Sequence, residues 1–406
     1  MASSSNALGT TAGGTSVSES ATLQLEGGIT LAEAITFNKA EALISASGNN
    51  TISGNIIIAD AGGNPDIMSA AGSTLTISGV VSGTQSTNLF FGKSTHTGTV
   101  TLSGNNTFTN YINVNGGTLI LAHNNALGAT TNGVSGISSG ATLALQGGIT
   151  VAEVEIRVNG TGVASAGALQ SISGNNTFSG QLRLSTNATV GVTTDSLTLS
   201  GVVTDSTSIR SLTKAGAGTL VMSATNTYDG ATTVSAGTLI ASGGNAITDT
   251  SAVTVASGAT FTVNDLDSET VGSIAGAGNI VANGGTLTVG GDNTSTTFSG
   301  VIGDNNGGTM TLAKLGSGTL TLSGTNTYTG TTSVSGGALS ISADSNLGAG
   351  ALTLNSGTLS LTGNSATIDN AISLGSSGGT IEGANTNTLS GVISGSGSLT
   401  KSGAGT

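Results

Sequence analysis

The sequence predicts an all-β protein built as a β-solenoid, in which short strands coil around one continuous core. Three observations predict this fold. Short runs in which Leu, Ile or Val alternate with Thr or Ser recur along the chain, a pattern typical of half-buried strands. Glycine-rich corners separate these runs, since the 406 residues include 67 Gly. The same phrases also return at short intervals, which indicates stacked repeats that share a core.

Two phrases carry the repetition. The first reads GTLTLSGTNTYTG from Gly318 to Gly330: an alternating strand, turn residues and a second short extended stretch. Copies that share its Asn-Thr pair begin at Ser47, Ser103, Ser173 and Ser223. A second phrase, Leu-x-Lys-x-Gly-x-Gly-Thr, begins at Leu212, Leu312 and Leu399.

The spacing of the strand units predicts the length of one coil. Comparable units begin at Leu220, Leu239, Phe261, Leu287 and Met310, which gives about 22 residues per coil. A βαβ unit needs about 30 residues or more, so this spacing favours a solenoid with two or three strands per coil. A sandwich or several small β domains is the alternative, because Asn-Gly turns such as the one at Asn115 are typical of hairpins.

One early segment has the composition of a helix. Residues 30–45 contain Ala, Glu and Leu, but their duplicate favours a strand. In that duplicate Ala152, Val154, Ile156 and Val158 alternate with Glu153, Glu155 and Arg157. This alternation predicts a strand with one apolar and one charged face. Residues 62–66, which include the single Pro, are expected to form an irregular loop.

Composition excludes several classes of function. The formal net charge is −12 and the eight basic residues are spread singly, so nucleic acid and anionic membrane surfaces are poor partners. The absence of Cys excludes disulfides and thiolate chemistry. No apolar run approaches the roughly 18 residues of a membrane-spanning helix, and no signal peptide is visible. The repeat breaks off at Thr406, so we expect residues 1–406 to be one continuous solenoid fragment, truncated at both ends.

The repeated polar and aromatic residues have structural interpretations. Asn106, Asn176, Asn226 and Asn326 are expected at corners, where they form ladders or Asx turns and are not ligands. Phe108, Phe178, Tyr228 and Tyr328 are expected to pack in the core or on coil flanks, in preference to forming a sugar-stacking stripe.

The charged residues also suggest no active centre. The segment from Asn264 to Glu269 is predicted to be a solvated acidic turn; a Ca²⁺ loop is the alternative. His96 and His123 lack the spacing of a metal site, and Gly276-Ala277-Gly278 lacks the following helix of a phosphate loop. Glu153 and Glu155 with Arg157 are interpreted as a charged outer strand face. We therefore assign no catalytic, cofactor-binding or metal-binding residue, expect no cofactor, and predict that the chain is not an enzyme.

At these phrases the sequence resembles the autotransporter-associated β-strand repeat, also called the passenger-associated transport repeat. Residues 212–239 match it most closely and residues 312–339 nearly so, with departures at Ala313 and Ala338. The resemblance implies a right-handed parallel β-helix that serves as the passenger of a type V secretion system. It implies an extracellular place, anchored at or released from the outer membrane of a Gram-negative cell. The family's C-terminal membrane β-barrel is its expected partner and is not contained in this chain.

The resulting prediction is a structural, export-supporting passenger stalk of an adhesin-like surface protein. Its expected partners are a host-cell, matrix or glycan surface, and it is expected to be monomeric. The alternative is a polysaccharide-degrading β-helix enzyme, which requires carboxylates within roughly 5–10 Å of each other. An ice- or crystal-binding face would need a Thr-x-Thr array on every coil, and the variable coil lengths disfavour it.

Overall fold

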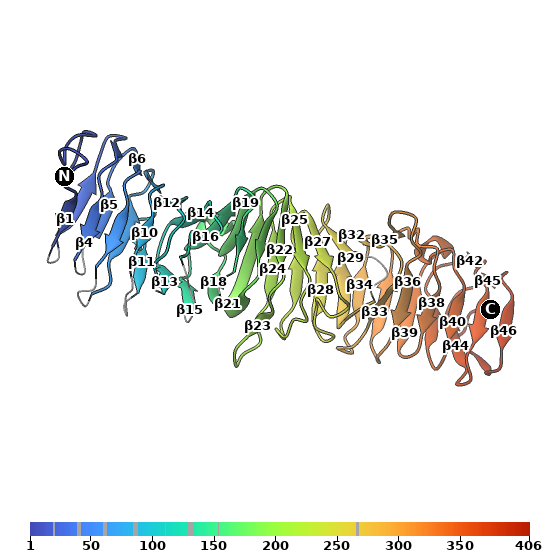
Figure 1. Ribbon diagram of the computed structural model, residues 1–406. Coiled ribbons are helices and arrows are strands. Elements are labelled where there is room, and N and C mark those ends of the chain that lie inside the picture. Colours follow the sequence, from blue (N-terminus) through green and yellow to red (C-terminus); the bar gives the residue numbers. More distant parts are fainter. Residues whose placement is uncertain are drawn as a thin grey trace. The chain divides into compact units, whose positions relative to one another are not determined.

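The computed structural model is an all-β chain in which the strands of successive coils pair in parallel (Figure 1). It describes residues 1–18, 21–38, 42–59, 63–83, 88–109, 111–128, 134–152, 154–264 and 268–406. The chain divides into two compact units. The first contains residues 1–210 and 215–218, and the second contains residues 211–214 and 219–406.

The strands of the first unit form three stacks. The first stack contains β2 (Thr22–Leu25), β5 (Ala42–Ser45), β8 (Asp66–Ser69), β11 (Leu89–Phe91), β13 (Ile112–Val114), β15 (Val134–Ile137), β18 (Glu155–Gly160), β21 (Gln181–Val192) and β23 (Val203–Asp205). The second contains β3 (Thr30–Leu31), β6 (Asn49–Ile52), β9 (Thr74–Ile77), β12 (Thr99–Leu102), β14 (Thr118–Leu121), β16 (Thr142–Gln146) and β19 (Leu169–Ser173), which pairs with the end of β21. The third side contains β1 (Thr15–Val17), β4 (Ile35–Phe37), β7 (Ile56–Ile58) and β10 (Val81–Ser82), and later β17 (Thr150–Val151), β20 (Asn176–Phe178) and β22 (Ser196–Leu199).

The second unit repeats this arrangement. One stack contains β24 (Leu212–Ala215), β26 (Thr232–Val234), β28 (Ala252–Val255), β31 (Ser273–Gly276), β34 (Thr296–Phe298), β37 (Thr319–Leu322), β39 (Ala338–Ile341), β41 (Thr358–Leu361), β44 (Gly379–Gly383) and β47 (Leu399–Ser402). A second contains β25 (Thr219–Met222), β27 (Thr238–Ala241), β29 (Thr260–Val263), β32 (Asn279–Ala282) and β35 (Val301–Asp304). A third contains β30 (Glu269–Val271), β33 (Thr286–Val289), β36 (Thr311–Lys314), β38 (Thr332–Val334), β40 (Leu352–Leu354), β43 (Ile372–Leu374) and β46 (Ile393–Gly395), and β42 (Thr367–Ile368) pairs with β45 (Thr388–Leu389).

Helical structure in the described part of the chain consists of two single turns, η1 (Val163–Ser165) and η2 (Asp344–Asn346). Neither these turns nor any other helix among the described residues is long and apolar enough to cross a membrane.

The alternating pattern of each strand explains the core. In β37 Leu320 and Leu322 are buried, and Thr319 and Thr321, which alternate with them, are half-buried. Because side chains alternate across a strand, each short strand contributes one or two apolar residues to the interior, and stacking joins these contributions. One circuit takes 21 residues from Ile35 to Ile56, its register partner on the next coil, which confirms the predicted coil length.

Glycine is required where successive corners touch. A Cβ on Gly324 would lie 1.9 Å from the carbonyl oxygen of Gly300, one coil away. At this corner a Cβ would therefore push two neighbouring coils apart. Glycine also follows the first serine in the copies that begin at Ser47, Ser103 and Ser173, whereas the copy at Ser223 has Ala224.

Several predictions about the fold are now decided. The predicted solenoid with two or three strands per coil is confirmed. The sandwich alternative is wrong, because strands pair in parallel with strands one coil away. Within residues 30–45, the described parts 30–38 and 42–45 contain β3, β4 and β5 in place of a helix. The placement of Leu287 in the same stack as Phe261 is wrong: Phe261 pairs with Ile280, and Leu287 pairs with Glu269 in another stack.

Candidate functional site

The repeated asparagines join successive coils. Asn106 is buried; its Oδ1 accepts the Val81 N–H at 2.8 Å and its Nδ2 donates to the Ala126 carbonyl at 2.7 Å. One side chain therefore bonds the coil before it and the coil after it. Asn326 does the same between Ile302 and Asn346. The predicted corner position is confirmed for Asn106 and Asn326 and is wrong for Asn176, which begins β20. The predicted ladder of amides is wrong for Asn106 and Asn326, because their partners are main-chain groups.

Asn176 and Asn50 bond in a second way. Both lie near the duplicated Gly-Gly-Ile-Thr phrase. Asn176 Oδ1 accepts the N–H groups of Gly148 at 3.0 Å and Ile149 at 2.9 Å, one coil back. Its Nδ2 donates to Ser171 Oγ at 2.8 Å and thereby closes its own corner. Asn50 makes the equivalent pair of bonds to Gly28 and Ile29.

Glu269 occupies a comparable position as a carboxylate. It is 1% exposed and accepts the N–H groups of Ala246 and Ile247, the latter at 2.6 Å. The prediction of a solvated acidic turn from Asn264 to Glu269 is therefore wrong at Glu269. Charge-assisted bonds from two main-chain donors offset the cost of burying this carboxylate. Residues 265–267 of that segment lie outside the described residues.

The aromatic residues of the repeat are core residues, as predicted. Phe108, Phe178, Tyr228 and Tyr328 are fully buried, so they offer no platform for a sugar. Each tyrosine keeps a hydrogen-bond partner in the core: the Tyr228 hydroxyl lies 2.6 Å from Thr232 Oγ1, and the Tyr328 hydroxyl lies 2.7 Å from Thr332 Oγ1. Burial raises the pKa of both tyrosines.

Two lysines are buried although the sequence analysis did not predict it. Lys214 and Lys314, both from the Leu-x-Lys-x-Gly phrase, are almost completely buried. Lys214 Nζ donates to the Ala236 carbonyl at 2.9 Å, and Lys314 Nζ donates to the carbonyl of Gly316 at 3.2 Å. Burial lowers the pKa of Lys214 to about 8. Burial also lowers the pKa of Lys314, against an opposing effect of Asp292.

A signal for these lysines was present in the sequence. Lys214 follows the inward-facing Leu212 by two positions, so alternation places it on the apolar side of β24. A buried ammonium group needs acceptors for its protons, and the carbonyls of the glycine-rich corner provide them. The Lys and Gly of this phrase therefore act together: the glycine-rich corner supplies the carbonyl groups that bind the buried ammonium group.

The acidic strand around Glu155 differs from the prediction. Glu155 is 8% exposed and Val154 is 54% exposed, so the apolar and charged faces do not alternate through this segment as expected. The Glu155 carboxylate binds Arg157 Nε and Arg183 Nη2, each at 2.9 Å. Glu153, the other carboxylate in that prediction, lies outside the described residues.

The remaining candidates do not form a metal or phosphate site. His96 Nδ1 lies 3.0 Å from Thr95 Oγ1, and His123 Nδ1 accepts the Asn125 N–H at 3.0 Å. No group of three or more His, Cys, Asp or Glu side chains in the described ranges could hold a metal ion. Gly276 ends β31 and leads through Gly278 directly into β32, so the Gly-x-Gly string is a corner between strands.

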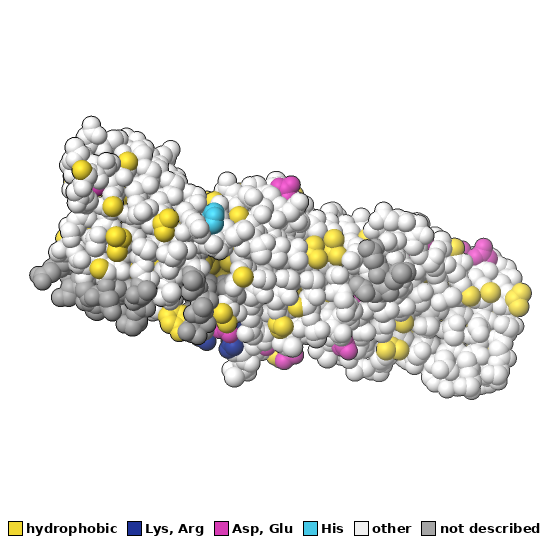
Figure 2. Space-filling model, in the orientation of Figure 1, with side chains coloured by type: hydrophobic (Ala, Val, Ile, Leu, Met, Phe, Trp, Pro, Cys, Tyr) yellow, Lys and Arg dark blue, Asp and Glu magenta, His cyan; other side chains and the backbone are white. Residues whose placement is uncertain are grey.

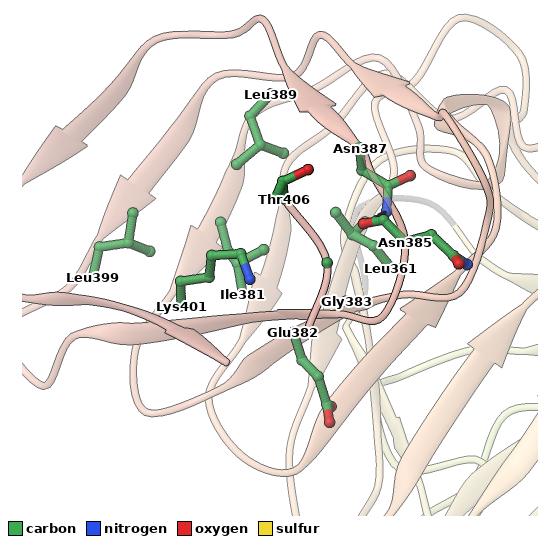
Figure 3. A pocket seen from close by; sticks show the side chains of 11 residues that line it. Leu361, Ile381, Glu382, Gly383, Asn385, Asn387, Leu389, Leu399, Lys401 and Thr406 are labelled. Atoms are coloured by element: carbon green, nitrogen blue, oxygen red, sulfur yellow. Dashed lines mark hydrogen bonds between the residues drawn. The ribbon is translucent and has the colours of Figure 1, made fainter. Parts of the chain in front are cut away.

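A cavity of about 170 Å³ lies at the last coil of the second unit (Figure 3). Apolar side chains from successive coils line it, among them Leu361, Ile381, Leu389 and Leu399. Glu382 is the single carboxylate in its lining, so the cavity does not provide the carboxylate pair of a polysaccharide-degrading enzyme.

Comparison with known proteins supports the repeat assignment. The family described as Passenger-associated-transport-repeat matches residues 95–121, 212–241 and 312–341. The chain therefore contains passenger-associated transport repeats. Two matches coincide with the units identified from the sequence. The third covers the copy at Ser103, which has the Asn-Thr core but lacks the lysine phrase.

The chain is also similar to a curated protein. It is 33% identical over 248 residues to "Adhesin BmaC autotransporter" of Brucella suis biovar 1 (strain 1330). The alignment covers 58% of this chain and 6% of that adhesin. No solved structure matches the chain. The chain therefore spans a small fraction of the length of the curated protein that it matches.

Proposed function

We propose that this chain is a structural, export-supporting stalk within the passenger of an autotransporter, displayed at or released from the bacterial surface. One observation carries the proposal: buried polar side chains of one coil are completed by the main chain of the next. Asn106 needs the Val81 N–H of the preceding coil and the Ala126 carbonyl of the following one. Lys214 likewise reaches the following coil at Ala236.

This bonding pattern suits a chain that folds as it emerges from a pore. In a solenoid each coil contacts its neighbours alone, so stability is the sum of local terms and interfaces between neighbours. A completed coil presents buried acceptors and donors that specify the register of the next. Folding outside the cell by coil addition would bias movement through the pore, and a chain without Cys cannot be crosslinked on the way.

The export role is tested with a matched pair of variants. Asn106→Ala removes the bonds to two neighbouring coils, whereas Asn105→Ala changes an exposed neighbour. Each is placed in a passenger with a signal peptide and membrane anchor, and surface exposure is followed over time by external protease. Slower exposure of the Asn106 variant alone is expected. Equal rates for both variants would remove the export role.

The adhesin-like role rests on the similarity to a protein named as an adhesin, and on the polar outer surface of the coils (Figure 2). The expected partners are host-cell, matrix or glycan surfaces. Beads coated with the purified chain are tested on cultured cells, on immobilised matrix proteins and on glycans. Failure to bind any of these would remove the adhesive role and leave the export role intact.

A further inference from the structure

Two of the three arginines of the chain lie on neighbouring strands of the first unit, and the third follows the next strand of the same stack. Arg157 on β18 and Arg183 on β21 are register partners, and Arg183 is in turn the register partner of Thr204 on β23. Arg210 follows β23, and its main-chain N–H donates to Asp205 Oδ2 at 3.1 Å. Basic residues are otherwise spread singly, so this grouping is a local exception on a chain of net charge −12.

Glu155 accepts hydrogen bonds from two of these arginines, but it does not use all of the donors of their guanidinium groups. Glu155 binds Arg157 through one oxygen and Arg183 through the other. The Nε atoms of Arg183 and Arg210 are buried without a hydrogen-bond partner. The Arg210 guanidinium makes no ion pair with any described carboxylate. Those buried Nε atoms are out of reach of a ligand, but the Arg157 and Arg183 side chains remain 47% and 31% exposed, so their outer donors are open to an acceptor from outside the chain.

Exposed aliphatic side chains lie beside the arginines. Val154 is 54% exposed, Val202 37% and Ile209 71%. The Val154 carbonyl accepts the Gln181 N–H at 3.0 Å and the Val202 carbonyl accepts the Leu182 N–H at 2.9 Å, so both flank the strand that carries Arg183. The set of Val154, Arg157, Arg183, Val202, Ile209 and Arg210 is called the arginine patch below.

Figure 2 shows that such a surface is uncommon on the one face that it draws. On the face drawn there, the Lys and Arg side chains form one small group next to Asp and Glu side chains, and most of the remaining surface is neither charged nor apolar. Clusters of Arg with exposed aliphatic residues are typical of surfaces that bind other proteins.

We propose that the arginine patch binds an extended acidic polypeptide segment in which Asp or Glu alternates with aliphatic residues. This inference rests on the adhesin-like role proposed above and names its ligand chemistry. The arginines would pair with carboxylates, and Val154, Val202 and Ile209 would bury the aliphatic side chains. The net charge of the chain repels an acidic segment elsewhere, which favours this patch. Branched aliphatic residues, in contrast to aromatic rings, are poor platforms for sugars, so a polypeptide fits better than an anionic glycan.

The test uses the 406-residue chain and a fluorescently labelled nonapeptide of alternating glutamate and valine. Its glutamine–valine counterpart is the neutral control, and binding is followed by fluorescence anisotropy at physiological ionic strength. The glutamate peptide is expected to bind, and the glutamine peptide is not. Affinity should fall as salt rises, because exposed charges are screened.

Three variants assign the binding to the patch. Arg210→Gln should weaken binding of the glutamate peptide about fivefold, because it removes one of the three cations of the patch. Ile209→Ser should weaken binding about threefold and leave its salt dependence unchanged. Lys401→Gln, which makes the same change in net charge at an exposed lysine of the other unit, should have no effect.

Three results would overturn the proposal: no binding of the glutamate peptide, equal losses for the Arg210 and Lys401 variants, or tighter binding of heparin that Ile209→Ser leaves unchanged. The last result would make the patch a glycan surface. Beads coated with the Arg210 variant distinguish this inference from the adhesin-like role. If they still adhere to cells although the variant no longer binds the peptide, the patch is not the adhesive surface, and this inference fails while the adhesin-like role stands.

Discussion

Replacing Asn176 by alanine tests whether the buried asparagines hold neighbouring coils together. Asn176 is 1% exposed. The substitution removes the acceptor of the N–H groups of Gly148 and Ile149, and the donor that closes its own corner through Ser171. Alanine fills less space and offers no polar atom, so both main-chain donors are left without a partner beneath the following coil.

The magnitude follows from the bonds that are lost. A buried donor without an acceptor costs about 1–3 kcal/mol. Two such donors, one of them partly reached by water, give a local cost of about 3 kcal/mol. Asn175→Ala is the matched control, because Asn175 is the exposed neighbour and its Oδ1 bonds a single exposed serine hydroxyl. That control should change stability by less than about 0.5 kcal/mol.

Hydrogen exchange is the appropriate assay, because a repeat protein opens locally and a single unfolding midpoint averages over many coils. A cost of about 3 kcal/mol corresponds to roughly 100-fold faster exchange in the segment that contains Gly148 and Ile149. Exchange in a distant segment such as residues 352–361 should stay the same. If the Asn176 and Asn175 variants exchange alike at the affected corner, the asparagine does not join the coils and the reasoning fails.

Three further predictions address the buried cation, the buried hydroxyl and the crowded corners. For Lys214, whose pKa falls from 10.5 to about 8 on folding, the unfolded chain binds more protons between these values; stability relative to Lys214→Met should therefore rise with pH across that window, and a flat difference in pH-dependent denaturant unfolding would contradict it. Tyr328→Phe leaves the Thr332 hydroxyl without its partner and should cost about 1–2 kcal/mol in thermal unfolding; an unchanged melting temperature would refute this. Gly324→Ala forces apart two coils and should cost about 2–4 kcal/mol, whereas Gly13→Ala, with open space around its Cβ, should be neutral in the same measurement.

Much of the fold could be predicted because the relevant information is local. Alternation within a run of four residues identifies a strand, and recurrence of Asn-Thr and Leu-x-Lys-x-Gly identifies the repeat. The burial of Tyr228 and Tyr328 followed from the same alternation. These features depend on neighbours in the chain, so they can be recognised in the sequence alone.

The errors arose where partners are separated by a whole coil. Leu287 was placed in the stack of Phe261 because the lengths of corners between strands cannot be read from an alternating pattern. The prediction that Glu269 is solvated is wrong because its two main-chain donors lie on the preceding coil, more than 20 residues away, where the local sequence does not show them. Lys214 was overlooked although its position was inward, since a charged residue is rarely assigned to a core without a visible acceptor.

The sequence by itself determined that this protein is a solenoid of short strands with passenger-type repeats, because strand periodicity and repeat spacing are properties of the chain. The tertiary structure decided which polar groups bind each other. Asn106 bonds the main chain of the coils on either side, and Glu155 pairs with Arg157 and Arg183. The physical reason is register. Contacts between coils depend on how many residues each corner consumes, and a change of one residue there exchanges the inward and outward faces of the next strand.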